Sequence, residues 1–339
     1  MTRQPALKDH PSKPATAQNA EPWFVLGPGS MGCLWSVAMT QHLESVLAQP
    51  VTLLLRDDNA VNFYPGKVTV EHSSGTTDRS VELTLPAMSV NDTSHGAFKI
   101  KRLLVACKAQ DADAALASVA AMLDEQAIIV LLQNGLKFQQ QLSLARPPGT
   151  VFCLSTSFGA WQREPFHVVA AGGGESWLGH LREESSPILQ RSQLQLLSEL
   201  PDVAMNIRID DDMQRRLWEK LAVNCAINGL TVIYNCRNGE LLTRPAAREH
   251  CQRLCTEIST LMHGIALAPD MPELWQRVQQ VAQATALNVS STLQDVRRGK
   301  HTEIEHLNGY LIELADRHRL PCPLNQQVVA AVLESGRPL

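Results

Sequence analysis

The chain has 339 residues, of which 44% are hydrophobic, 19% charged and 5% aromatic. This length is sufficient for two domains, and the composition is typical of a globular protein. The formal net charge of −4 and the pI of about 6.3 argue against a partner that recognises positive charge. We therefore expect neither nucleic acid nor a membrane surface as a partner.

The eight cysteines follow no spacing that is typical of a disulfide framework or a zinc site. Cys251 and Cys255 are four residues apart, but no second cysteine pair or nearby histidine pair completes a metal site. We expect reduced thiols, no metal and a cytoplasmic location. Residues 1–21 are polar, lack the apolar segment of a signal peptide, and are predicted to form a disordered extension.

The first predicted elements are a strand at 23–27, a helix from Ser30 to about Ala48 and a strand at 51–55. A strand, a glycine-rich turn, a helix and a strand form one βαβ unit. The alternation continues, and a glycine cluster at 172–174 is interpreted as a turn rather than a phosphate site. The further predictions are strands at 102–107, 127–132, 151–158 and 205–209, a helix at 111–124 and a hairpin at 167–180.

The second part of the chain has the pattern of successive helices, and strand patterns are nearly absent from it. The predicted helices are 211–229, 245–266, 271–287, 291–299 and 302–318. The expected fold class is α/β, with a Rossmann-type dinucleotide-binding domain at 22–209 and an all-helical domain at 210–335. No flexible linker separates them, which favours close packing and a cleft between the domains.

Residues 27–32 (GPGSMG) fit the pattern G-x-G-x-x-G. The first glycine allows a tight turn, the second lets a pyrophosphate approach the backbone, and the third brings the helix close to the strand. The motif closes an apolar strand and opens a helix, which is the context that a dinucleotide site requires. The predicted cofactor-binding residues are Gly27, Pro28, Gly29, Ser30, Met31 and Gly32.

The second predicted strand is followed by Arg56, Asp57 and Asp58. An acid at this place would bind the ribose diol of NAD, whereas an arginine suits the 2′-phosphate of NADP. Because Arg56 directly follows the strand, we predict that the cofactor is NADPH or NADP+. Asp57 would turn inward instead if the strand ended one residue later.

Lys220, Asn224 and Asn228 lie in the stretch KLAVNCAINGL and share one face of a helix. The residues between them are mostly apolar, which indicates a helix that is covered nearly all round. Buried amides are costly unless they are paired, so this polar row should face a polar cleft or a ligand. The alternative is a lysine that extends to water at the start of the helix.

A nicotinamide cofactor implies hydride transfer, and reduction of a carbonyl group needs a proton donor. Lys220 can hydrogen-bond the carbonyl oxygen and protonate the developing alkoxide. The amides of Asn224 and Asn228 can bind a hydroxyl or carboxylate group as donors or acceptors. The row therefore predicts a proton donor followed by two substrate-binding amides.

Several separated motifs resemble those of the ketopantoate reductases (2-dehydropantoate 2-reductases), from residue 23 to about 330. The resemblance implies a Rossmann-type domain joined to a helical domain, with the active site in the cleft. It also implies NADPH-dependent reduction of 2-dehydropantoate to (R)-pantoate, a step toward pantothenate and coenzyme A. The motifs are GPGSMG (27–32), LLVACKAQDADAAL (103–116), LLQNGL (131–136), KLAVNCAINGLT (220–231) and SSTLQDVRRGKHTEIEHLNGYL (290–311).

The resemblance also implies roles for single residues. Lys220 matches the general acid, and Glu303 matches a glutamate that orders the lysine and helps to hold the substrate hydroxyl. Ser291 matches a serine that binds the substrate carboxylate, with Asn288 contributing from just upstream. Asn224 and Asn228 match substrate-binding amides.

Three further residues match the cofactor side of the family's site. Asn134 matches an asparagine at the nicotinamide end of the cleft, where it and Glu303 contact both cofactor and substrate. Lys108 matches a lysine near the cofactor and the incoming substrate, and Arg56 matches the basic residue at the 2′-phosphate.

For four of these residues, the local sequence context also permits a purely structural interpretation. Ser291 could be the N-cap of a helix, because STLQ has the pattern of a capping box. Glu303 could be a first-turn glutamate that the helix dipole favours. Asn134 before a glycine is typical of a turn, and Lys108 could be solvated.

The sequence departs from the family at Gly229, which follows Asn228 where many relatives have proline. This difference puts the end of the helix, and the placement of Asn228, in question. One alternative function is an NADPH-dependent reductase of another 2-oxo acid, and a second is a protein that senses NADP(H) without turnover. The expected assembly is a monomer or a homodimer.

Overall fold

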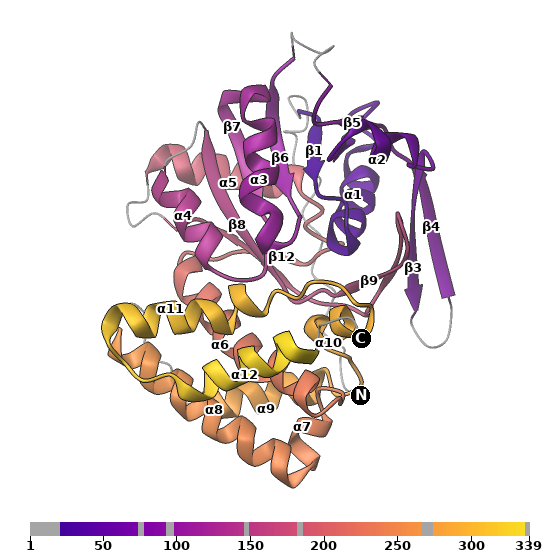
Figure 1. The fold of residues 1–339 in the computed structure, drawn as a ribbon. Helices are drawn as coiled ribbons and strands as arrows, with labels where there is room; N and C mark the ends of the chain where they lie inside the picture. The colour runs from indigo at the N-terminus through magenta and orange to yellow at the C-terminus, as the bar shows by residue number, and fades with distance from the viewer. Residues whose placement is uncertain are drawn as a thin grey trace, which may run out of the picture.

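The computed structural model describes residues 21–73, 78–92, 98–145, 149–181, 186–265 and 274–335. An α/β half comes first and a helical half follows it, which confirms the predicted fold class (Figure 1). The predicted extension at 1–21 lies outside the described residues except for Glu21. The domain boundary after residue 209 stays a prediction.

The main sheet carries the cofactor motif. Within the described ranges it has eight strands in the order β12-β11-β8-β7-β6-β1-β2-β5. The strands from β8 to β5 are parallel, and β11 runs antiparallel to β8. The bounds are β1 (Trp23–Leu26), β2 (Val51–Leu55), β5 (Ala87–Ser89), β6 (Ile100–Val105), β7 (Leu123–Leu131), β8 (Thr150–Thr156), β11 (Ser176–Gly179) and β12 (Ile207–Ile209).

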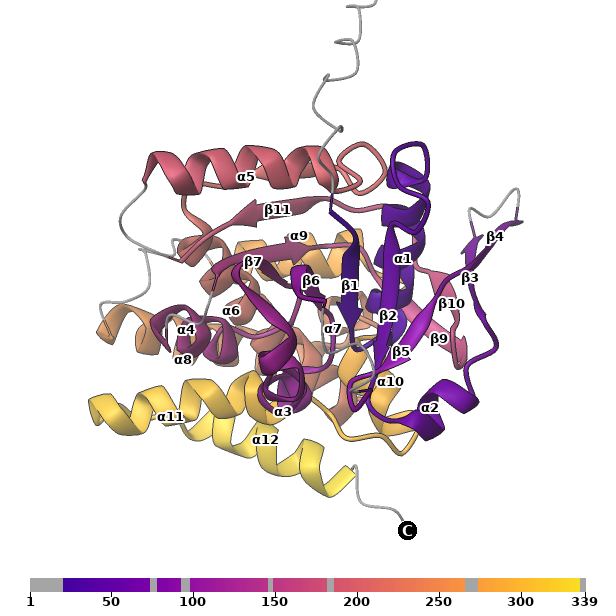
Figure 2. The same ribbon diagram turned by 90° about the horizontal axis from the view of Figure 1, so that it is seen from above.

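Helices cover both faces of this sheet (Figure 2). One apolar core joins α1 (Ser30–Leu43) and α5 (Pro187–Glu199) to one face, and another joins α3 (Ala109–Val119) and α4 (Lys137–Ala145) to the other. Strands covered on both faces are continuous apolar runs, as the central strands here are. The short α2 (Asp58–Asn62) follows β2.

The strand order reverses between β1 and β6. The chain continues from β1 to β2 on one side, whereas β6, β7 and β8 extend the sheet on the other. In an open α/β sheet, ligands bind beyond the carboxyl ends of the strands at such a switch point. The turn at 27–32 leaves β1 at this place.

A second sheet was not predicted from the sequence, and it has the order β4-β3-β10-β9. The predicted hairpin at 167–180 is wrong, because β10 lies in this second sheet and β11 lies in the main sheet. The glycines at 172–174 carry the chain between the two sheets. The antiparallel partner of β10 is β9, joined to it through Phe166, whose φ is 62°. The bounds are β3 (Lys67–Ser73), β4 (Asp78–Thr84), β9 (Ala160–Glu164) and β10 (His167–Ala170).

In the second half, all the regular elements among the described residues are helices. The predicted helix at 302–318 is a single 3₁₀ turn, η3 (Ile304–His306), followed by α11, and α12 was not predicted. The first three residues of the predicted helix at 271–287 lie outside the described residues. Within the described ranges, no helix combines the length and apolar character that crossing a bilayer requires. The bounds are α6 (Met213–Ile233), α7 (Glu240–Thr243), α8 (Pro245–Gly264), α9 (Leu274–Ala284), α10 (Ser291–Arg297), α11 (Asn308–His318) and α12 (Pro323–Ser335).

Other predicted elements differ in extent. The first helix ends at Leu43 rather than near Ala48. The helix predicted at 111–124 comprises α3 and a 3₁₀ turn, η2 (Ala120–Met122), so the following strand begins at Leu123.

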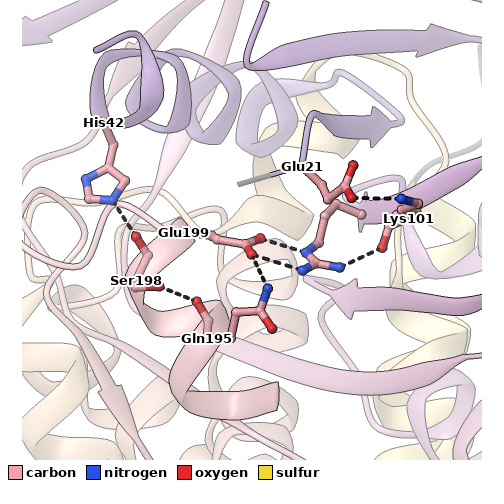
Figure 3. Close-up of polar contacts among 7 residues, drawn as sticks. Glu21, His42, Lys101, Gln195, Ser198 and Glu199 are labelled. Atoms are coloured by element: carbon pink, nitrogen blue, oxygen red, sulfur yellow. Dashed lines mark hydrogen bonds and ion pairs between the residues drawn. The ribbon is translucent and has the colours of Figure 1, made fainter. Parts of the chain in front are cut away.

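A buried ion pair fastens α5 to the main sheet (Figure 3). Arg102 on β6 donates from Nε to Oε2 of Glu199 at 2.6 Å and from Nη2 to Oε1 at 2.9 Å. The amide of Gln195 donates to the same carboxylate at 2.9 Å. The side chains of Arg102 and Glu199 are 7% and 5% exposed, so this pair is part of the folded interior.

Candidate active site

The polar row on α6 faces one large cavity. α6 begins after Asp212, whose side chain accepts from the Arg215 N–H at 3.2 Å, and continues to Ile233. Lys220, Asn224 and Asn228 all line a cavity of about 780 Å³ between the two halves. This is the arrangement that their spacing predicts.

Gly229 does not end the helix. α6 continues for another turn, so Asn228 lies in its regular interior. A Cβ built on Gly229 would overlap Cγ1 of Val328 on α12. The glycine therefore lets α12 pack closely against α6 while Asn228 keeps its place on the cavity wall.

Lys220 is half-buried between the halves. Its Nζ donates to the carbonyl oxygen of Thr156, at the end of β8, at 3.0 Å. Burial lowers the pKa of Lys220 to about 8, and the negative charge of Glu303 opposes this shift. The result is an ammonium group at the edge of the cavity that can release its proton near neutral pH.

Glu303 acts on this lysine through its charge and lies outside the cavity wall. Its carboxylate accepts from the backbone N–H of Ala109, the first residue of α3, at 3.0 Å. Burial raises the pKa of Glu303, while that hydrogen bond, the charge of Lys108 and a hydrogen bond from Asn134 oppose the rise. Glu303 thus joins the helical half to the start of α3 and places a carboxyl group near Lys220.

The other predicted substrate residues, Asn134, Asn288 and Ser291, also line the cavity. The capping interpretation of Ser291 is wrong, because the N-cap of α10 is Ser290, which accepts from the Leu293 N–H at 3.1 Å. Ser291 is the first residue of the helix, and its hydroxyl is free of the capping role. Asn134 precedes Gly135, whose φ of 90° confirms the turn there.

Lys108 lies outside the cavity wall, at the contact between the halves. Its Nζ donates to Oδ2 of Asp295 at 2.8 Å and to the carbonyl oxygen of His301 at 3.0 Å. Lys108 is therefore paired as well as partly solvated, since its side chain is 36% exposed. Lys108 is the N-cap residue of α3, so this ion pair ties α3 to α10.

The turn after β1 has the shape that a pyrophosphate requires. Gly27 has a φ of 82°, and a Cβ there would meet Cys107 at 2.5 Å. A Cβ on Gly29 would meet nothing within 4 Å, so its backbone is open to a ligand. Gly29 caps α1 without a side-chain hydrogen bond, and the first turn of α1 holds no acid. These features leave the helix N-terminus available to phosphate groups.

Arg56 and Asp57 differ in what their side chains do. β2 ends at Leu55, and the Arg56 side chain is 88% exposed beyond it. Asp57 accepts from the Ala60 N–H at 2.7 Å and so caps α2. Oδ2 of Asp57 also lies 3.2 Å from Nε of Arg56, so the acid both caps α2 and pairs with the arginine. The exposed guanidinium of Arg56 is the group that can reach a 2′-phosphate.

The sequence interpretation missed a group of cavity residues that surround the polar row. Arg216 lies one turn before Lys220 on the same face, so the four-residue spacing would have identified it. Trp161 and Trp177 come from strands of different sheets, and no local signal brings them together. The missed lining residues include Trp161, Trp177, Arg216, Arg277, Arg297 and Arg298.

The cysteines play no evident part in this site. All eight lie within the described ranges, and none of them forms a disulfide. Among the described residues, no group of three or more His, Cys, Asp or Glu side chains is placed to hold a metal ion.

The fold and the cleft are those of a protein that joins a Rossmann-type half to a helical half. Two family models match this chain. The one described as "Ketopantoate reductase PanE/ApbA" matches residues 23–183, and the one described as "Ketopantoate reductase PanE/ApbA C terminal" matches residues 212–335. This chain belongs to the ketopantoate reductase family.

Individual relatives agree with the family models. The 2-dehydropantoate 2-reductase of Yersinia pestis is 34% identical over 243 residues, which are 71% of this chain and 76% of that protein. The 2-dehydropantoate 2-reductase of Salmonella typhimurium is 30% identical over 316 residues, which are 91% and 93% of the two chains.

Solved structures show the same fold. A ketopantoate reductase of the PanE/ApbA family from Ralstonia eutropha has a TM-score of 0.78 and 21% identity, with 93% of this chain and 98% of that chain covered. D-mandelate dehydrogenase in complex with NADH and anilino(oxo)acetate has a TM-score of 0.81 and 18% identity, with the same coverage.

Proposed function

We propose that this chain is an NADPH-dependent 2-dehydropantoate 2-reductase that reduces ketopantoate to (R)-pantoate. The single observation that carries the proposal is the row of Lys220, Asn224 and Asn228 on one wall of the cavity. The family to which the chain belongs supports the substrate and the cofactor. The partner is a small molecule, and a monomer or a homodimer remains the expected assembly.

In the proposed reaction, Lys220 is the general acid. The nicotinamide supplies the hydride when the cofactor is bound, and the carbonyl oxygen then needs a proton. Lys220 Nζ is held at the cavity edge by Thr156, and it donates this proton as negative charge develops on the oxygen. Glu303 stabilises the ammonium form, because its charge raises the pKa of the lysine against the effect of burial.

The remaining cavity residues hold the substrate in this proposal. Asn224 and Asn228 bind the hydroxyl and carboxylate groups from α6, and Ser291 and Asn288 bind the carboxylate from the start of α10 and the residues just before it. The amide of Asn134 bonds Glu303 and lies on the cavity wall, so it can orient the carboxamide end of the cofactor as well as the substrate. Side chains on several walls fix the position of the carbonyl group relative to Lys220.

The cofactor residues in this proposal are the turn from Gly27 to Gly32, Arg56 and Lys108. The turn and the start of α1 would hold the pyrophosphate, and Arg56 would hold the 2′-phosphate. Lys108 lies between the halves and would meet the cofactor there. The open backbone at Gly29 supports this fit.

An assay of NADPH oxidation tests the function directly. The purified protein is supplied with ketopantoate and, in parallel, with pyruvate and 2-oxoisovalerate. We expect the highest kcat/KM for ketopantoate, because only this acid offers the hydroxyl group that the asparagines can bind. A rate on ketopantoate that does not exceed the other two would contradict the proposed substrate, and no oxidation with any acid would favour a protein that senses NADP(H).

A second candidate function is the reduction of another 2-oxo acid. It is favoured by Trp161 and Trp177, which line the cavity and could pack against a larger apolar side chain. The structure of D-mandelate dehydrogenase with anilino(oxo)acetate shows that this fold accommodates an aromatic oxo acid. Phenylglyoxylate, added to the same assay, distinguishes the two candidates.

A further inference from the structure

The cavity is larger and more basic than a small monocarboxylic acid requires. Its volume of about 780 Å³ is in the range of sites that hold drug-sized ligands. Five of its lining side chains are basic and one, Glu219, is acidic, although the whole chain carries a formal net charge of −4. The basic lining residues are Arg216, Lys220, Arg277, Arg297 and Arg298.

Arg216 extends the polar row of α6 by one turn. It lies four residues before Lys220, so its side chain leaves the same face about 6 Å further along the helix axis. α6 contacts both β8 and β11 along this face. Lys220 bonds the end of β8, whereas Arg216 lies over a residue of β11, the neighbouring strand.

The guanidinium of Arg216 is held in place from two sides. It stacks over the indole ring of Trp177, with 4.0 Å from Cζ to the ring centroid, and its Nε donates to Oδ2 of Asp210. A guanidinium has five N–H donors, so the single bond to Asp210 leaves donors that can reach a ligand. The Arg216 side chain is 27% exposed and belongs to the cavity wall.

This cationic group is far from the turn that fits the cofactor's pyrophosphate. β1, which leads into that turn, and β11, which carries Trp177, are separated by β6, β7 and β8. Four strand spacings of about 4.8 Å place them roughly 19 Å apart. Arg216 therefore serves a different part of a ligand from the pyrophosphate.

We propose that Arg216 is a specificity-determining residue that binds a distal carboxylate of the substrate, so that the cavity also accepts dicarboxylic 2-oxo acids. A fixed, planar guanidinium matches a carboxylate with two parallel hydrogen bonds. The axial spacing between Lys220 and Arg216 suits an acid whose second carboxylate lies two methylene groups beyond the reacting carbonyl. The inference rests on the proposed function for the hydride transfer at that carbonyl.

The test compares two acids that differ only at the distal end. 2-Oxoglutarate carries the second carboxylate, and 2-oxopentanoate has a methyl group there. We expect the wild-type protein to prefer 2-oxoglutarate by about tenfold or more in kcat/KM, mainly through KM. Arg216→Gln should remove this preference and leave the rate with 2-oxopentanoate within about twofold, because an amide keeps the polar contact to Asp210 but loses the charge.

Two further variants separate recognition from folding. Arg215→Gln is the matched control, since Arg215 is the preceding residue, is 51% exposed and pairs with Glu219; it should keep the preference. Arg216→Lys retains the charge but not the planar group, and it should lose part of the preference even if Arg216→Gln does not fold. Equal losses for both acids in the Arg216 variants would assign a purely structural role to this residue and overturn the proposal.

The outcome is distinguishable from a failure of the proposed function. A protein that reduces ketopantoate but has no preference for 2-oxoglutarate over 2-oxopentanoate contradicts only the Arg216 subsite. A protein that prefers 2-oxoglutarate to 2-oxopentanoate but neglects ketopantoate supports the subsite and contradicts the proposed substrate. Oxidation of NADPH with none of these acids contradicts both.

Discussion

Burial of Lys220 sets the pH range in which the proposed general acid works. With its pKa near 8, the ammonium is mostly protonated at neutral pH and mostly deprotonated at pH 9. Reduction needs the protonated form, so kcat/KM for ketopantoate should fall about tenfold per pH unit above pH 8. The oxidation of pantoate needs the neutral amine, and its rate should rise through the same range. Initial rates in both directions between pH 6 and pH 10 measure this profile.

Removal of the amine provides the control for this profile. Lys220→Ala should lower turnover by about a hundredfold or more, as expected for a lost general acid. It should also abolish the decline above pH 8, while NADPH binding measured by fluorescence titration persists. Turnover near the wild-type value would show that another group donates the proton.

Arg56 should determine the choice between the two nicotinamide cofactors. A hydrogen-bonded ion pair with the 2′-phosphate contributes about 2 kcal/mol, so Arg56→Ala should raise the Kd of NADPH by roughly thirtyfold. The Kd of NADH should change by less than about twofold, because NADH lacks that phosphate. Arg208→Ala is a suitable control, since Arg208 is 61% exposed on β12 at the opposite edge of the sheet. Equal losses for both cofactors would assign Arg56 another role.

At the residue scale, the sequence predicted the site best where a regular spacing of four residues connected several polar side chains. The interval of four residues placed Lys220, Asn224 and Asn228 on one face, and the cavity confirms that face. It was less informative where two adjacent residues compete for one role. Ser290 and Ser291 are both good caps, and only the backbone geometry shows that Ser290 accepts the capping hydrogen bond.

At the element scale, α6 depends on Gly229 for its packing. Because a Cβ there would overlap Val328, Gly229→Ala should cost about 1–3 kcal/mol through overpacking and so lower the free energy of unfolding by up to about 2 kcal/mol net. The helix propensity that alanine adds offsets about 1 kcal/mol of this cost. Urea unfolding followed by circular dichroism measures the change.

A double-mutant cycle identifies the contact as the cause. Val328→Ala removes the atom that the new Cβ would meet, so the two substitutions together should cost less than the sum of their separate effects. Strictly additive losses would show that Gly229 is required for a reason other than its contact with α12.

The elements that the sequence did not predict depend on partners distant in the chain. β3 has buried valines at alternate positions, Val68 and Val70, but its partners include β10, about a hundred residues further on. The two apolar runs around the glycines at 172–174 resemble a hairpin, although they belong to different sheets. By contrast, α12 had a local signal in Val328 and Val332, which are four residues apart and both buried.

At the scale of the whole molecule, the two halves share contacts that neither half could satisfy alone. The apolar core of the helical half includes Leu136 and Cys153 from the α/β half. Lys108 and the Ala109 N–H reach across to acids of the helical half. The absence of a flexible linker predicted such close packing. The residues that form these contacts could not be predicted, because they depend on the relative orientation of the two halves, and residue spacing along the chain carries no information about that orientation.

This shared core leads us to expect one cooperative unfolding transition, and the buried pair of Arg102 and Glu199 tests it. Glu199→Gln leaves the Arg102 guanidinium buried without a counter-charge, which costs about 3–5 kcal/mol. Although both residues lie in the α/β half, the whole transition should move to lower temperature by several degrees. Calorimetry should show the unfolding transition as a single peak. Thermal unfolding followed by circular dichroism, which reports the loss of helix, should have the same midpoint temperature.

The matched control for this change is Glu219→Gln. Glu219 also pairs with an arginine, but that pair is exposed on α6, with side chains that are 51% and 32% exposed. Exposed pairs contribute about 0–1 kcal/mol, so the midpoint should move by less than about two degrees. Two separate peaks in the Glu199→Gln variant, with only the first displaced, would show that the halves unfold independently despite their shared core.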